Sequence, residues 1–163
     1  MKTFVFAVGI ILCLLIQKSV FFLNFGTKPD FLLILVIFLS LLKGPVPGLK
    51  IGFIIGFVED LVEGKYFGIN ILTKMLTGLM IGFMEPKIFK ENYLVPVVTV
   101  CLGTLLNEIL FVFFGNLIGM GFPWGTSFWH RILPLTLYNS IVAVFVYVPF
   151  YKLYISKWLN KER

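Results

Sequence analysis

Small or acidic residues recur at intervals of four along one short stretch of the chain. They are Gly48, Gly52, Gly56, Asp60, Gly64 and Gly68. Residues four apart lie on one face of an α-helix. Because glycine has no side chain, a second helix can approach such a face backbone to backbone, as helices do in membranes. We therefore expect this glycine stripe to be a helix-packing and partner-binding surface. Asp60 adds a carboxylate that requires a polar partner in lipid.

The composition indicates that the stripe lies in a membrane. Hydrophobic residues make up 59% of the 163 residues, 13% are charged and 19 are phenylalanine, and the mean hydropathy is +0.98. Soluble domains carry about 25% charged residues. We therefore expect an all-α integral membrane protein, with a single domain over residues 1–163 and no separate soluble module.

Hydropathy predicts six transmembrane helices. The apolar segments are 4–23, 31–42, 49–62, 69–84, 94–118 and 132–154. A perpendicular span needs about 20 residues, so the second, third and fourth segments are short. Short helices are tolerated where neighbours cover their ends or the bilayer thins. Pro45 and Pro47 separate the second segment from the third, although these two segments could instead form one re-entrant pair.

The distribution of lysine and arginine predicts the orientation. Nine basic residues fall on the side of the N-terminus: Lys2, Lys43, Lys50, Lys87, Lys90, Lys152, Lys157, Lys161 and Arg163. Four fall on the other side: Lys18, Lys28, Lys65 and Arg131. The positive-inside rule then places both termini in the cytoplasm. The net charge of +6 needs no nucleic acid, because a nucleic-acid site would cluster these charges on one soluble face.

Polar residues of four predicted helices fall at similar depth, in the outer half of the membrane. This polar layer consists of Glu59, Asp60, Lys74, Asn107, Glu108 and Asn139. Within it, Asp60 and Lys74 are expected to pair. Three roles remain open for the layer. Its groups could pair with one another and fix helix register, line a ligand pocket open to the outside, or receive polar groups of another membrane protein.

Catalytic and cofactor motifs are missing from the sequence. A single histidine cannot build a multi-histidine zinc site, and neither a G-x-S-x-G elbow nor a phosphate-binding loop occurs. Ser127 and His130 lie close in sequence, but no orienting acid accompanies them. We therefore expect no enzyme, no cofactor and no metal.

An ordered series of short motifs resembles a known family. The series comprises Pro29-Asp30-Phe31-Leu32-Leu33, Lys43-Gly44-Pro45, the Gly52/Gly56/Asp60 stripe and Gly68-Ile69-Asn70. In order and spacing it resembles the MreD family of rod-shape-determining proteins, from Pro29 to about Gly82. The flanking helices match mainly in length and hydropathy. Pro29, Asp30 and Asn70 are the family-motif residues outside the stripe.

The resemblance implies a non-enzymatic component of the elongasome, the assembly that directs lateral peptidoglycan synthesis. The expected location is the bacterial cytoplasmic membrane. The implied partners are MreC, through its transmembrane helix and adjoining segment, and the MreB, RodA and class B penicillin-binding transpeptidase components of the same complex. The implied fold is similar to the substrate-binding subunits of energy-coupling vitamin transporters. The alternative function is therefore a small-molecule-binding subunit of such a transporter, which should hold a ligand in a closed pocket.

Overall fold

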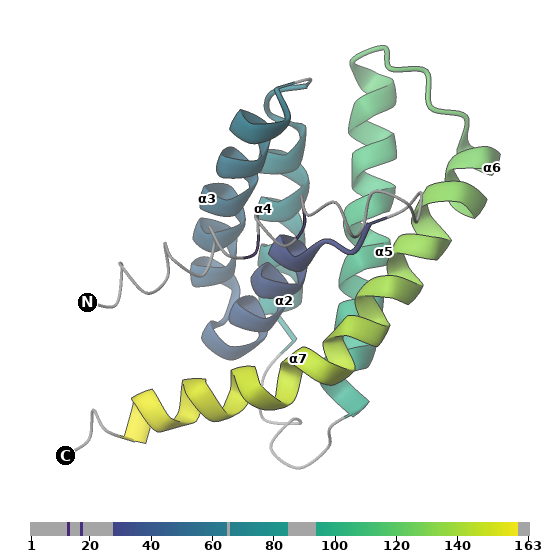
Figure 1. Cartoon of the computed structure of the whole chain (residues 1–163). Helices are drawn as coiled ribbons and strands as arrows, with labels where there is room; N and C mark the ends of the chain where they lie inside the picture. Colours follow the sequence, from purple (N-terminus) through teal and green to yellow (C-terminus); the bar gives the residue numbers. More distant parts are fainter. Residues whose placement is uncertain (1–12, 14–16, 18–27, 65, 85–93, 160–163) are drawn as a thin grey trace.

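The structure, a computed structural model, describes Cys13, Gln17 and residues 28–64, 66–84 and 94–159 (Figure 1). The regular secondary structure of these residues is entirely helical. The elements are α2 (Phe31–Lys43), α3 (Pro45–Glu63), α4 (Ile69–Gly82), α5 (Leu94–Leu117), α6 (Trp124–Ser127), the π-helix η3 (Phe128–Ile132) and α7 (Leu133–Leu159). Apart from Cys13 and Gln17, the helix expected over 4–23 lies outside the described residues.

Helix α2 is the centre around which the other helices pack. It contacts α3, α4, α5 and α7, and nine of its 13 residues are buried. On one side Ile37 and Phe38 pack with residues of α4, α5 and α7, and on the other side Val36 packs with Ile51 and Ile55 of α3. A helix that is apolar around its whole circumference is buried rather than amphipathic. The short length of α2 is thus compensated by neighbours on several sides.

The junction between α2 and α3 is tight because of its glycine and prolines. Gly44, with φ of +90°, ends α2 in a conformation that residues with side chains rarely adopt. Pro45 follows as the first residue of α3, where its missing N–H costs no hydrogen bond. Helix α3 therefore begins four residues earlier than expected and includes both prolines in its first turn.

Helices α3 and α4 form a hairpin in close backbone contact (Figure 1). A Cβ atom added at Gly52 would lie 2.6 Å from the carbonyl carbon of Lys74, and one at Gly56 would lie 2.6 Å from the Cα atom of Ile71. Gly48 meets the backbone of Gly78 in the same way. Gly78 and Gly82 of α4 complete the contact from the other side. This second row of glycines was not singled out from the sequence.

The glycine stripe is shorter than expected and is already covered. Helix α3 ends at Glu63, and Gly64 and Gly68 lie in the turn to α4 with φ of +66° and +104°. The stripe on the helix is therefore Gly48, Gly52 and Gly56. Because α4 occupies this face, Gly48, Gly52 and Gly56 fulfil the expected helix packing within the chain, and they are not open to the expected partner.

The second group of helices consists of α5 and α7, joined through α6 and η3. In the segment between α5 and α7, the chain is helical from Trp124 onward. Pro123 precedes this first turn, and the helix then widens into the π-helix before α7. The widened turn carries His130 and Arg131.

One helix of the described residues could cross a membrane by length and composition. It is Val95–Leu117, with 23 residues and mean hydropathy 2.1. Phe31–Lys43 and Ile69–Gly82 are apolar but shorter than a span. The six-span topology and the transporter-like fold stay predictions.

Candidate functional site

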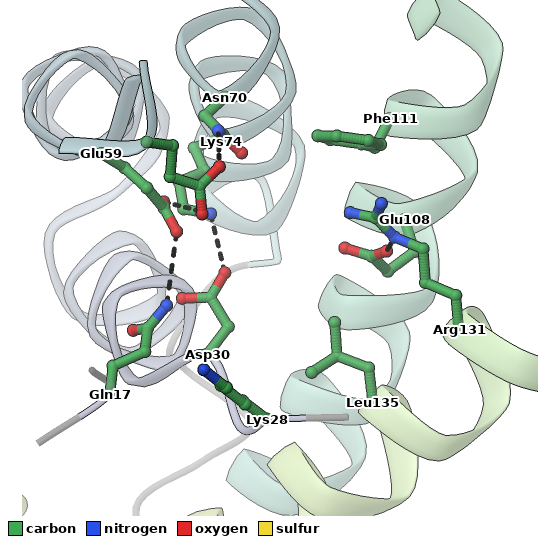
Figure 2. A pocket seen from close by; sticks show the side chains of 11 residues that line it. Gln17, Lys28, Asp30, Glu59, Asn70, Lys74, Glu108, Phe111, Arg131 and Leu135 are labelled. Carbon is green, nitrogen blue, oxygen red and sulfur yellow. Dashed lines mark hydrogen bonds and ion pairs between the residues drawn. The ribbon is translucent and has the colours of Figure 1, made fainter. Parts of the chain in front are cut away.

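A polar cavity of about 220 Å³ lies between the α3–α4 hairpin and the α5–α7 pair (Figure 2). Charged and amide side chains from distant parts of the chain line it, together with two apolar ones. The lining residues are Gln17, Lys28, Asp30, Glu59, Glu63, Asn70, Lys74, Glu108, Phe111, Arg131 and Leu135.

Asp30 lines this cavity and contacts the three helices α2, α4 and α7. Its Oδ1 atom accepts a hydrogen bond from the Leu33 amide (2.7 Å), which caps α2, a role that aspartate commonly plays. Its backbone N–H donates to Oδ1 of Asn139 on α7 (2.8 Å). Its Oδ2 atom lies 2.7 Å from Nζ of Lys74 on α4. Asp30 therefore fixes the position of α2 against both helix groups.

Lys74 is shared by two carboxylates. Its Nζ atom is 2.7 Å from Asp30 Oδ2 and 2.7 Å from Glu59 Oε2, and the residue is only 1% exposed (Figure 2). Glu59 also accepts a hydrogen bond from Nε2 of Gln17 (3.4 Å). The expected pairing of Lys74 with Asp60 is therefore wrong. The adjacent residue of α3 makes the ion pair, because Glu59 rather than Asp60 points toward the space between α2 and α4.

Asp60 instead caps the start of α4. Its two carboxylate oxygens accept four hydrogen bonds of 2.9–3.2 Å, from the backbone amides of Gly68, Asn70 and Ile71 and from Nδ2 of Asn70. The first amides of a helix have no partners within it, and their partial positive charge favours an anion. Asp60 thus finds the polar partners that it was expected to need at the start of α4, and these hydrogen bonds close the α3–α4 turn.

Glu108 of α5 and Arg131 of η3 form an ion pair that lines the cavity across from Lys74. The guanidinium Nε atom is 2.6 Å from Glu108 Oε2, and the guanidinium carbon lies 3.8 Å from the centre of the Phe111 ring. Glu108 Oε1 accepts a longer hydrogen bond from Asn107 Nδ2 (3.3 Å). Arg131 is partly exposed, whereas Glu108 is buried.

The structure brings the predicted polar layer together in two parts. Glu59, Lys74 and Glu108 line the cavity, while Asp60 lies behind Asn70 in the α3–α4 turn. Asn107 and Asn139 are buried beside the cavity without lining it, and Nδ2 of Asn139 donates to Oγ1 of Thr104 (3.2 Å). Of the family-motif residues, Asp30 and Asn70 line the cavity and Pro29 is buried next to Asp30.

Most of the lining residues were not assigned to the predicted polar layer, and Asp30, Glu63 and Gln17 are among them. Asp30 was noted for the family motif but not as a member of the polar layer, although an aspartate before an apolar run is a helix-cap signal. Glu63 ends α3 and accepts a hydrogen bond from Asn70 Nδ2 (3.2 Å). Gln17 carried no signal beyond its polarity within an apolar segment.

The described residues of the site offer ion pairing and hydrogen bonding. Ser127 is buried in α6, and His130 is exposed in η3. Within the described parts of the chain, no cluster of three or more histidine, cysteine or acidic residues could hold a metal ion.

A comparison with known protein families gives a match over most of the chain. Residues 1–157 match the family described as rod shape-determining protein MreD. The chain belongs to the MreD family. The resemblance found in the sequence between Pro29 and Gly82 is thus confirmed and extends over nearly the whole chain. No curated protein and no solved structure matches the chain.

Proposed function

We propose that the chain is a non-enzymatic membrane adaptor of the elongasome that binds the transmembrane helix and adjoining segment of MreC. The observation that carries this proposal is the family match over residues 1–157, since MreD proteins determine rod shape. The other elongasome components, MreB, RodA and the class B penicillin-binding transpeptidase, would be reached through this complex.

The helix surfaces support binding to a partner helix. The face of α3 opposite its glycines carries Phe53, Phe57 and Leu61, which are spaced four residues apart and are 47%, 39% and 60% exposed. Phe53 and Phe57 stack with their ring centres 6.4 Å apart. This ridge is apolar, and the opposite face of α3 is packed closely against α4. We propose that MreC packs against it.

The cavity supports the adaptor over the transporter subunit. Pockets for small molecules usually measure about 300–1,000 Å³ and are mostly apolar. The cavity here is smaller, at about 220 Å³, and is lined mainly by charged side chains. A vitamin would have to displace buried ion pairs, whose separation is costly.

The proposed setting is the bacterial cytoplasmic membrane, with six crossings and both termini in the cytoplasm. The apolar helix Val95–Leu117 and the charge distribution support it. In this orientation the cavity lies toward the outer surface, on the side where MreC continues beyond its span.

Purification in mild detergent tests the proposal. The tagged chain is expressed with MreC, and the purified material is analysed for bound protein by quantitative immunoblot and for bound small molecules by mass spectrometry. We expect MreC to co-purify at a fixed ratio without a vitamin. A stoichiometric vitamin, with no MreC, would establish the transporter alternative.

A further inference from the structure

We infer that the polar cavity receives a cationic side chain, lysine or arginine, from the partner's segment just outside the membrane. This inference rests on the proposed function and names the chemistry of the contact that the cavity makes.

The charges of the described lining residues carry the inference. Four carboxylates, from Asp30, Glu59, Glu63 and Glu108, face three cations, from Lys28, Lys74 and Arg131. Glu108 and Arg131 already form a pair. In the buried part of the cavity, Asp30 and Glu59 share the single charge of Lys74. One negative charge is therefore in excess among side chains that are almost fully buried, and such a charge calls for a counter-ion.

Two buried oxygen atoms support the same conclusion. Glu59 is only 4% exposed, and among the described residues its Oε2 atom has no partner other than the ammonium of Lys74, which it shares with Asp30. Oε1 of Gln17 has no hydrogen-bond donor among the described residues. Both residues line the cavity. An ammonium or guanidinium group would supply the charge and the N–H donors together.

The position of the cavity explains how a single partner could reach it. Glu63 lies at the end of α3, lines the cavity and is exposed. Leu61, on the proposed binding ridge, lies at the same end of the helix. A helix is about 10 Å in diameter, so roughly three to four extended residues would cross over the end of α3. We therefore expect the basic residue within about ten residues of the outer end of the partner's span.

Matched charge variants test the inference by co-purification with MreC. Glu63→Gln should reduce the amount of bound MreC several-fold, as expected for a partly exposed contact, without disturbing the buried ion pairs. Glu59→Gln should reduce it roughly 30-fold or more, as loss of a buried charge partner does. Lys28→Gln should leave it unchanged or increase it, because a competing cation is removed. Glu91→Gln, in the connector before α5, is the charge-matched control and should have no effect.

The partner side identifies the cation. Each lysine and arginine within about ten residues of the MreC span is changed to glutamine, and one change should reproduce the loss seen with Glu63→Gln. Changing that residue to glutamate should be rescued by Glu63→Lys. Thermal unfolding of each purified chain identifies any variant that fails to fold. Because Glu63 is exposed, we expect Glu63→Gln to fold, so the test remains decisive even if Glu59→Gln does not fold.

Three outcomes would overturn the inference while leaving the proposed function standing. Wild-type MreC could co-purify unchanged with all the glutamine variants. The loss could instead be reproduced only by Lys18→Gln, which would make a lysine of this chain the counter-ion. Lipid mass spectrometry could also find a bound phosphatidylethanolamine that is lost with Glu63→Gln while MreC is retained. Absence of MreC from the wild-type purification would contradict the proposed function itself.

Discussion

Replacing Gly52 by alanine probes the contact on which the α3–α4 hairpin depends. The added Cβ atom would lie 2.6 Å from the Lys74 carbonyl carbon and 2.8 Å from the Met75 Cα atom. Carbon atoms pack best at about 3.5–4.0 Å, so the two helices must separate by roughly 1 Å. Both obstructing atoms belong to the backbone, which means that no rotamer change can relieve the clash. The same shift would displace Lys74 from its two carboxylates.

Overpacking of this kind typically costs about 1–3 kcal/mol. For a chain of this length, that corresponds to a fall in melting temperature of roughly 2–12 °C. We expect this fall for Gly52→Ala in mild detergent, measured by thermal unfolding at a fixed scan rate. The matched control is Gly125→Ala, because Gly125 is exposed in α6 and an added Cβ would contact nothing within 4 Å. Equal melting temperatures for the two variants would refute the close-contact reasoning.

Three further predictions concern charge and topology. Lys74→Met should abolish accumulation of the protein in membranes, because it leaves Asp30 and Glu59 facing each other without a cation. Adding Asp30→Asn and Glu59→Gln should restore part of this accumulation. Immunoblots that show no recovery would argue against the shared ion pair. Asp60→Ala should lower the melting temperature more than Asp60→Asn, because the amide keeps one acceptor for the first amides of α4; equal losses would mean that the cap contributes little. A reporter that is active only outside the cytoplasm should stay silent when fused after Arg163, and a strong signal would reverse the proposed threading.

The close backbone contact made by α3 and the polar character of the site could be predicted from the sequence. Glycines every four residues specify a helix face, and charges in apolar segments specify approximate depth. Depth, however, does not give rotation about the helix axis. Glu59 and Asp60 are adjacent residues at nearly equal depth, about 100° apart around α3. Only the packing of α2 against α3 and α4 decides that Glu59 meets Lys74 and that Asp60 turns toward the start of α4.

The sequence also did not indicate which helices lie next to one another. Gly78 and Gly82 become meaningful only when α4 is known to lie against α3. In the same way, Asp30 joins the site because α2 begins beside both Lys74 and Asn139, residues 44 and 109 positions away in sequence. Such long-range contacts depend on how all the helices assemble, which the hydropathy of single segments does not encode.

Cysteine crosslinking tests most directly the central claim that the chain binds MreC through its helices. Cysteines at Phe53, Phe57 and Leu61, on the exposed face of α3, are combined with cysteines along the MreC span in a background without Cys13 and Cys101. We expect disulfide-linked heterodimers at these positions, with a three-to-four-residue rhythm along the span, and none at Ile55, which is buried against α2. Co-purification of the two proteins with no crosslink at any of the three exposed positions would contradict the proposed interface.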